Sequence, residues 1–383
     1  MAHNYSYADF ETLGYTNSTV STLISVAQFI NLLSLNVVKY QFVLACIGVV
    51  VNIFHLIILL RKTMRSNSIN VIMTGIGACD LFNMSVLVYG NLLAMIHPNS
   101  DCFPPASYTI QLMELWAAAI KDDLRRLSAW FGVLMAVIRL LIIKFSLNPK
   151  FNKLSKPGFS VLLMLIALIL STCWSSFYWA RLTLVEVEPW KPEASCTGFP
   201  ANYTEVQYVV GINAEFLSDA LMMIQIFLIS DGILKIIPTI MFPILTFLLI
   251  RELKRAENSR RKIAVAVQRK EDRSDHTTNL VILMTVTFMT AEGPLGIVYV
   301  IQGLVTNNAG FTEMASDVMD IFTLFVALNA ITHCIICLTV SSQYRKTVKD
   351  LFMCKGASSS SAILVSAKVS VSSIQDPSVR NHS

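Results

Sequence analysis

Apolar positions along the chain gather into long runs that are separated by short polar segments. The first run spans residues 40–60 and stops at a basic segment. A helix needs about 20 apolar residues to cross a bilayer of about 30 Å, and six later runs have that length. The pattern therefore predicts an all-α membrane protein, a bundle of seven transmembrane helices. The six later runs lie at residues 69–96, 115–149, 159–182, 229–250, 279–304 and 318–340.

Composition agrees with a membrane protein. Mean hydropathy is +0.58, and charged residues make up only 14% of the chain. A soluble domain usually carries about 25% charged residues, so this chain has too little polar surface for a soluble fold of its size. The net charge of +5 is not a reason to expect nucleic-acid binding, because the position of the basic residues matters more than their sum.

The segments outside the spans predict three parts. Residues 1–39 form a polar N-terminus with a mildly apolar stretch, and the absence of Lys and Arg before Lys39 argues against a cleaved signal peptide. Residues 40–352 form the membrane domain. Residues 353–383 form a tail that is rich in Ser and has no run long enough to span, so we expect it to be disordered.

The basic residues predict the orientation. Of the 30 Lys and Arg, 22 fall after the first, third and fifth spans or in the tail, and four fall in the N-terminus, the other loops and the top of the fifth span, where Lys235 lies. Cytoplasmic loops carry the excess of basic residues. We therefore expect a multi-pass plasma-membrane protein with its N-terminus outside and its tail in the cytoplasm. Glycosylation sequons at Asn4, Asn17 and Asn202 fall in the segments assigned to the outside.

Cysteine positions predict one disulfide. Of the eight Cys, five lie in the spans and Cys354 lies in the tail. Only Cys102 and Cys196 face the oxidising exterior, where disulfides persist. We expect them to be bonded, which would tie the loop after the fourth span to the approach of the third. The alternative is a pair of free thiols.

The third span carries charges in its outer half. At 100° per residue, Lys121, Arg125, Ser128 and Arg139 lie on one stripe of the helix. Charged groups within a membrane helix are costly and usually face the bundle interior or a cavity. The stripe therefore predicts a polar pocket at the outer end of the helix, with Asp122 beside it.

The chain resembles the rhodopsin-like G-protein-coupled receptors at several positions within its predicted spans. They are Asn52, Asp80, Arg139, Pro243 and Pro294. The resemblance covers about residues 40–352. It implies a receptor that binds an extracellular peptide or small chemical cue and activates a heterotrimeric G protein. The stretches 52–81, 135–145, 236–253 and 341–352 are more similar still to the nematode Srw-class serpentine chemoreceptors, a group similar to FMRFamide-type neuropeptide receptors, which implies sensory neurons as the site of expression.

The resemblance also implies a role for Arg139, which takes the place of the family's conserved Arg at the G protein. The family usually has an acidic residue before it and often Tyr after it, and this chain has Ile138 and Leu140. In the family, the acidic residue before the conserved Arg helps to hold the receptor in its inactive state. This chain has Ile138 there, so the resemblance does not predict that interaction for Arg139. The alternative is that Arg139 has no role at the G protein and only anchors the third span at the edge of the membrane.

The resemblance further implies a candidate sodium site. Asp80, Ser128 and Asn329 match three positions that bind sodium in many family members. The Asn-Pro-x-x-Tyr motif of the seventh span is missing, and His333 takes the place of its Asn. A protonated His333 would replace sodium beside Asp80. The other interpretation is a neutral His333 that is hydrogen-bonded in a polar core. We expect no other cofactor and no other metal.

Glu292 occupies the place where the family usually has Trp, two residues before Pro294. In the family's geometry this position neighbours Arg125 on the floor of the pocket. We therefore expect a buried ion pair between Arg125 and Glu292, with Lys121 and Asp122 completing a ligand pocket. The alternative is that Arg125 pairs with Asp122 and Glu292 with water.

At the inner end, residues 341–352 predict a short amphipathic helix along the membrane lipid. Cys354 follows it as a candidate palmitoylation site, and the tail offers Ser residues to kinases and arrestin. A solute transporter that uses the intramembrane charges is the alternative function, although the chain lacks internal repeats. No His-Glu-x-x-His motif or nucleophile elbow is present, so we expect no enzyme activity.

Overall fold

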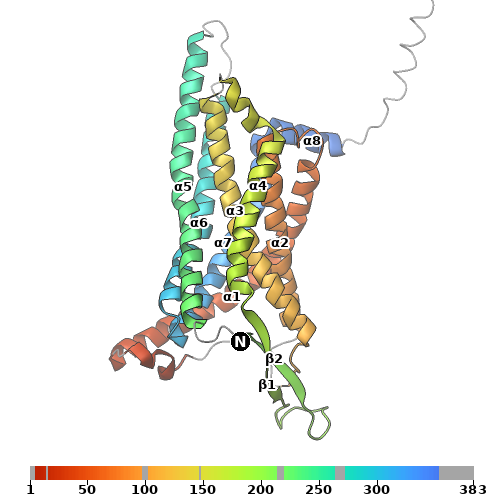
Figure 1. Ribbon diagram of the computed structural model, residues 1–383, viewed down its shortest axis with the longest axis vertical. Coiled ribbons are helices and arrows are strands. Elements are labelled where there is room, and N and C mark those ends of the chain that lie inside the picture. The colour runs from red at the N-terminus through yellow and green to blue at the C-terminus, as the bar shows by residue number, and fades with distance from the viewer. Residues whose placement is uncertain are drawn as a thin grey trace, which may run out of the picture.

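The computed structural model describes residues 5–13, 16–96, 102–145, 148–213, 220–263 and 272–352. These residues form a bundle of long helices with a β-hairpin at one end and a short helix across the other (Figure 1); we call the hairpin end the outer end and the opposite end the inner end. The long helices are α1 (Asn17–Leu59), α2 (Ser68–Ile96), α3 (Tyr108–Lys144), α4 (Pro157–Trp179), α5 (Ala220–Ile263), α6 (Asp272–Leu304) and α7 (Ala309–Val340). The smaller elements are η1 (Tyr7–Leu13), η2 (Pro149–Ser155), β1 (Leu182–Trp190), β2 (Glu205–Ile212) and α8 (Ser342–Phe352).

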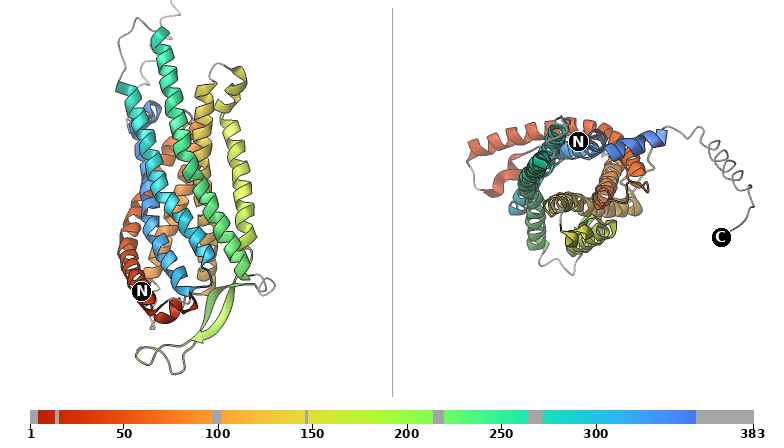
Figure 2. Two further views of the ribbon diagram at one scale, coloured as in Figure 1. Left: turned by 90° about the vertical axis from the view of Figure 1, so that its left-hand side faces the viewer. Right: turned by 90° about the horizontal axis from the view of Figure 1, so that it is seen from above.

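The helical class and the order of the elements agree with the sequence pattern. Each of the seven predicted runs overlaps one helix, from α1 to α7. Within the described residues, six helices are long and apolar enough to cross a membrane, namely α1 to α5 and α7. The remaining helix, α6, has 33 residues and packs along α5 and α7 (Figure 2). Large apolar side chains such as Val50, Leu170 and Phe247 point outward, each about two-thirds exposed, as a lipid-facing surface requires.

Helix α1 begins 23 residues before the predicted first span, so part of the segment expected to be a polar N-terminus is helical. Its 43 residues are about 64 Å long, twice the thickness of the hydrocarbon core. Polar residues interrupt the apolar pattern in the outer turns of α1. Asn31 and Ser34 are buried together with Val20 and Ala27, whereas Phe29 and Leu32 are exposed, so a search for an unbroken apolar run starts the helix too late.

Polar contacts hold this outer part of α1 against α7. Asn31 donates to Asp317 at 3.0 Å, and Tyr5, which precedes η1, donates its hydroxyl to the same carboxylate at 3.0 Å. Phe10 of η1 is fully buried and meets Phe311 edge to face. The N-terminal segment is therefore folded onto the outer end of α7.

The loop predicted between the fourth and fifth spans contains an antiparallel hairpin. Strand β1 pairs with β2 from Leu182 opposite Ile212 to Trp190 opposite Glu205. The alternation of Val and Glu in β1 is the period-two signal of a strand. The predicted disulfide between Cys102 and Cys196 is present, and it joins the tip of the hairpin to the approach of α3. Helix α5 begins at Ala220, nine residues before the predicted fifth span.

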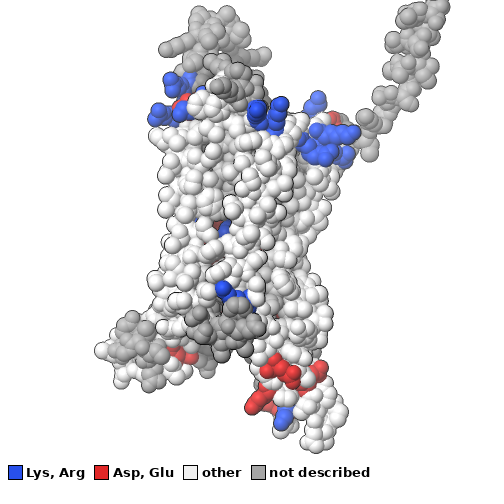
Figure 3. All heavy atoms as spheres, in the orientation of Figure 1, with Lys and Arg blue, Asp and Glu red and all other residues white. Residues whose placement is uncertain are grey.

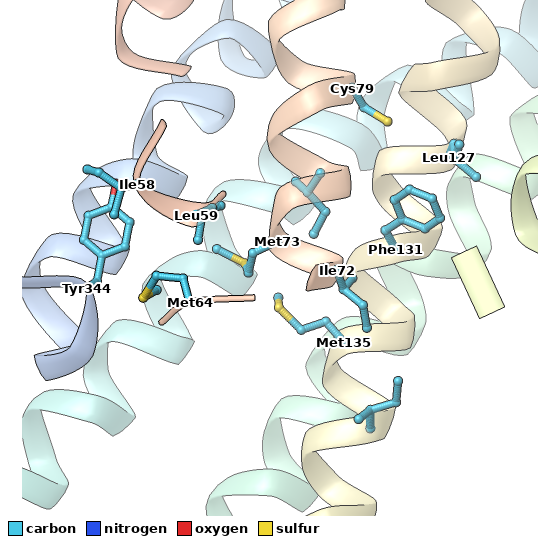
Figure 4. Close-up of a cluster of buried hydrophobic side chains, with 12 residues drawn as sticks. Ile58, Leu59, Met64, Ile72, Met73, Cys79, Leu127, Phe131, Met135 and Tyr344 are labelled. Atoms are coloured by element: carbon cyan, nitrogen blue, oxygen red, sulfur yellow. The ribbon is translucent and has the colours of Figure 1, made fainter. Parts of the chain in front are cut away.

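An apolar core joins α1, α2, α3 and α8 at the inner end (Figure 4). Tyr344 of α8 is fully buried in it, and its hydroxyl lies 2.9 Å from Nδ1 of His55. This contact fixes α8 across the end of the bundle. The core residues are Ile58, Leu59, Met64, Ile72, Met73, Ile76, Cys79, Leu127, Phe131, Met135, Ile138 and Tyr344.

Candidate ligand pocket and polar core

A cavity of about 580 Å³ opens at the end of the bundle that carries the hairpin. Its walls come from α2, α3 and the end of α4, and Leu182 and Val210 of the hairpin also line it. Binding sites for small molecules typically have volumes of about 300–1,000 Å³ and apolar walls with a few polar groups. We call this space the outer cavity. Its polar lining residues are Tyr89, Asn91, Gln111, Glu114 and Lys121.

The predicted contact between α3 and α6 is present. The Nε atom of Arg125 lies 3.4 Å from Oε1 of Glu292, and the two side chains are 11% and 7% exposed. Of the four residues predicted for the ligand pocket, only Lys121 lines the outer cavity. Arg125 and Glu292 line a smaller space deeper in the bundle, and Asp122 lines neither. Asp122 still interacts electrostatically with Arg125.

This inner cavity of about 40 Å³ collects the residues of the candidate sodium site. Ser128 donates to Oδ1 of Asp80 at 3.1 Å, and Nε2 of His333 lies 3.8 Å from the other oxygen, Oδ2. Asn329 lines the same space. Asn83, one turn from Asp80, also lines the inner cavity and was not among the predicted residues. The sequence signal for it is an amide three residues from a carboxylate in an apolar run.

The oxygen donors of the inner cavity fit a hard cation, which prefers oxygen ligands. Asp80 and Asn83 each have a buried side-chain oxygen with no hydrogen-bond partner among the described residues, and Nη2 of Arg125 and Nδ1 of His333 are in the same state. A polar cavity of this volume holds water when several polar atoms face it. The guanidinium of Arg125 already supplies one positive charge to this space, opposite Glu292.

A second group of buried charges, which was not predicted from the sequence, joins α3 to α5. Arg126 of α3 places Nε 3.3 Å from Oδ1 of Asp231 on α5, and Asp231 also pairs with Lys235 one turn along α5. The Nζ atom of Lys235 lies 3.9 Å from the centre of the Tyr299 ring on α6. Lys235 was predicted to lie at the outer top of the fifth span. This was wrong, because Lys235 is the sixteenth residue of α5 and its side chain is 1% exposed inside the bundle.

The same group continues into α4 through hydrogen bonds. Nη2 of Arg126 donates to Ser175 at 2.9 Å, and Ser175 donates to Asp123 at 3.2 Å. Ser171 and Thr172 also donate to Asp123. We call Asp123, Arg126, Asp231 and Lys235 the buried charge network. The signal that would have found it is a pair of opposite charges four residues apart, at Asp231 and Lys235, within an apolar run.

Comparison with known proteins places these features in a family. A family model described as serpentine type 7TM GPCR chemoreceptor Srw matches residues 39–355. The chain belongs to the Srw family. It is also 21% identical to the G-protein coupled receptor dmsr-1 of Caenorhabditis elegans, across 89% of this chain and 70% of that protein.

Family membership makes this Srw protein a G-protein-coupled receptor that spans the membrane several times. Its partners are an extracellular ligand and a heterotrimeric G protein, and membership of a receptor family implies a non-enzymatic role. The predicted receptor class is thereby confirmed. The transporter alternative has no support from these relatives.

Arg139 lies near the inner end of α3 in this Srw receptor, in the neighbourhood of Cys337 of α7. Its neighbour Ile138 is 2% exposed within the apolar core. No carboxylate of the described residues forms an ion pair with Arg139. The missing acidic neighbour is therefore not replaced by another described residue.

The modification sites predicted from sequence fall in different places. Asn4 and Cys354 lie outside the described residues. Asn17 is the first residue of α1, where it accepts a hydrogen bond from the Tyr7 hydroxyl. Asn202 is exposed between β1 and β2 and has a φ of 63°.

Proposed function

We propose that ligand binds in the outer cavity and that its effect reaches the G protein through the polar core of α3. The observation that carries this proposal is the Arg125–Glu292 ion pair, which joins α3 to α6 directly beside the inner cavity. Arg125 lies one turn below Lys121 of the outer cavity and 14 residues above Arg139, about 21 Å along the helix. A ligand that displaces the turn of α3 that contains Lys121 would therefore change the contact between α3 and α6.

The outer cavity favours a ligand that is mostly apolar, and the acidic hairpin favours a positive charge on the approaching ligand. The cavity wall itself carries one acidic and one basic residue, Glu114 and Lys121, whereas Glu186, Glu188 and Glu193 of the hairpin region are all exposed. A surface of one sign raises the local concentration of opposite charges. The volume suits a small chemical cue or the end residues of a peptide. Expression in sensory neurons follows from the resemblance to chemoreceptors alone.

The orientation that we propose puts the hairpin and the N-terminus outside and the tail in the cytoplasm of a cell whose plasma membrane holds the receptor. Basic residues support it, because they gather at the end of the bundle opposite the hairpin, whereas acidic residues gather on the hairpin (Figure 3). In this orientation α8 lies along the inner leaflet. Palmitoylation of Cys354 and phosphorylation of the Ser-rich tail by kinases, with arrestin binding, belong to the same proposal.

For the inner cavity, we propose that Asp80, Asn83, Ser128 and Asn329 can hold a sodium ion only if the imidazole of His333 is neutral. A protonated His333 would place its own positive charge 3.8 Å from Oδ2 of Asp80 and would replace the ion. The test compares the affinity of a probe ligand with and without sodium, and an affinity that sodium does not change is compatible with either state of His333. A normal sodium effect excludes the imidazolium.

Nucleotide exchange tests the proposed coupling. Membranes that contain the receptor would be mixed with a panel of G proteins and with pools of peptides and small molecules. We expect pool-dependent exchange that is abolished by Arg139→Ala and is retained in Lys144→Ala, which removes a basic residue five positions farther along α3. Exchange that survives Arg139→Ala would move the coupling role to another residue. If no pool produces exchange with well-expressed receptor, uptake of labelled solutes is the next assay.

A further inference from the structure

A second large space lies on the membrane side of the bundle, between α3, α4 and α5. It has a volume of about 380 Å³, and most of its lining is apolar, including Trp130, Leu134, Leu163 and Ala167. Leu170 and Ile166 at its edge are 67% and 46% exposed. Helix α4 lies at the periphery of the bundle (Figure 2), so this groove faces the hydrocarbon of a bilayer. We call it the lipid-side groove.

One end of the lipid-side groove is polar. Arg126 and Trp174 both line it. The Nη1 atom of Arg126 and the Nε1 atom of Trp174 are buried and have no hydrogen-bond partner in the described part of the chain. Both atoms are donors, and Arg126 is only 2% exposed. An unmet buried donor costs about 1–3 kcal/mol, so this end of the groove calls for an acceptor.

The buried charge network sets the charge of that acceptor. Asp123 and Asp231 carry two negative charges, and Arg126 and Lys235 carry two positive charges. These four side chains are in contact through the ion pairs and the Ser175 hydroxyl described above. A bound anion would leave an excess negative charge in a medium that solvates it poorly. A neutral carbonyl or ester oxygen meets both donors without that penalty.

The depth of the polar end matches the position of such an oxygen. Trp174 lies five residues from the outer end of α4, about 7–8 Å along the helix, and Trp side chains favour the interfacial zone of the bilayer. From there the groove extends toward Leu163, which is 11 residues farther along α4. A straight acyl chain with a carbonyl at its head has the shape and the polarity of this space.

We propose that the lipid-side groove binds one acyl chain of a glycerolipid from the outer leaflet, with an ester carbonyl accepting from Arg126 and Trp174. The assignment to the outer leaflet depends on the orientation proposed above, whereas the binding of an acyl chain in the groove does not. The bound chain would fill the space between α4 and α5 beside the Arg126–Asp231 ion pair, and the occupant would thereby contact the elements that hold α5 in place.

Photolabelling of the full-length receptor in lipid nanodiscs tests this assignment, because both leaflets are accessible there. The probe is a phosphatidylcholine with a diazirine in one acyl chain, and labelled peptides are mapped by mass spectrometry. We expect labelling of the α3 and α4 peptides that contain Trp130 and Leu163, and a loss of at least tenfold in Ala167→Trp, which fills the groove. The matched control is Ile169→Trp, which adds the same ring on a 61% exposed position of α4 outside the groove lining.

A second arm tests the carbonyl. Unlabelled diester lipid should compete with the probe roughly five- to tenfold better than a diether lipid of equal chain length, because the diether lacks the acceptor. Trp174→Phe keeps the ring and removes one donor, so it should reduce that preference. Equal labelling of Ala167→Trp and Ile169→Trp would mean an annular lipid only and would overturn the groove site. Equal competition by diester and diether would overturn the assigned hydrogen bonds.

Discussion

Two adjacent arginines of α3 form ion pairs with carboxylates on other helices. Arg125 meets Glu292 of α6, and Arg126 meets Asp231 of α5. Adjacent residues of α3 are 100° apart around the helix, so the two arginines reach different neighbours. An unpaired charge in such a place is costly. Each pair therefore restricts how α5 and α6 can sit against α3.

The Arg125–Glu292 pair leads to a reciprocal test. Arg125→Glu and Glu292→Arg should each lower the free energy of unfolding by about 3–5 kcal/mol, because each leaves two like charges buried together. The double variant restores opposite charges and should recover most of the surface expression lost in the singles. Cell-surface labelling measures this recovery of expression, and Lys121→Ala is a control that removes a cation one turn away. Failure of the double variant to recover would argue that the side chains do not meet in the membrane.

Asp231 should be the most sensitive member of the buried charge network. Asp231→Asn leaves Arg126 and Lys235 without the carboxylate between them, at a cost of about 3–5 kcal/mol. Adding Lys235→Met removes one of the two stranded cations, so the double variant should regain part of the lost Tm. Thermal unfolding in detergent measures the change, with Glu252→Gln near the inner end of α5 as control. Equal melting of Asp231→Asn and the control would contradict the role given to the network.

Sequence alone predicted one of these two ion pairs. The pair of Arg125 and Glu292 could be predicted because these two positions are neighbours in the family's geometry. The disulfide could be predicted because the other six cysteines lie in the spans or the tail. Asp231 was overlooked because its span was judged by hydropathy, and an i, i+4 pair of opposite charges barely changes that average. Which of two adjacent arginines meets which helix depends on the packing of α3, which no local pattern contains.

At the scale of elements, α1 departs most from the sequence prediction. Its outer turns bury amide and hydroxyl groups against α7 and expose Phe29 and Leu32. The polar residues on this buried face interrupt the apolar run, and the hydrogen bonds to α7 that compensate for their burial cannot be read from hydropathy. The hairpin had a local signal in the alternation of Val and Glu, but its pairing with β2 required the fold. The centres of the spans were predictable because lipid requires long apolar helices.

Asp317 should control the order of the outer turns of α1. It accepts hydrogen bonds from both Tyr5 and Asn31, so Asp317→Ala removes the acceptor that joins the N-terminal segment to α7. We expect faster amide hydrogen exchange across residues 17–35 and little change in the inner half of α1, since the inner half packs on α2 and α7 independently. Ser316→Ala, at the adjacent exposed position, is the control. Uniform exchange rates in both variants would show that the apolar cluster around Phe10 is sufficient.

The whole molecule combines two charge patterns. Exposed basic residues lie over α5 and α8 at one end, and exposed acidic residues lie on the hairpin at the other (Figure 3). The band between them is white in Figure 3 apart from a few small coloured patches. Correcting the position of Lys235 removes one of the few basic residues that had been counted on the hairpin side. The charge asymmetry that predicts the orientation is therefore slightly stronger in the folded protein than along the sequence.

That orientation can be tested at the tip of the hairpin. Asn202 has a positive φ of 63°, which few side chains adopt without strain, so replacing it would disturb the turn as well as the sequon. Thr204→Ala removes the sequon and leaves Asn202 in place, and Thr204→Ser keeps the sequon with nearly the same side chain. We expect a loss of one glycan in Thr204→Ala and none in Thr204→Ser, read as the mass removed by an endoglycosidase. The tail supplies the opposite test, because Ser383→Ala removes the sequon at Asn381. A glycan lost in that variant would put the tail outside, and the G protein would then have to meet the end of the bundle that carries the hairpin.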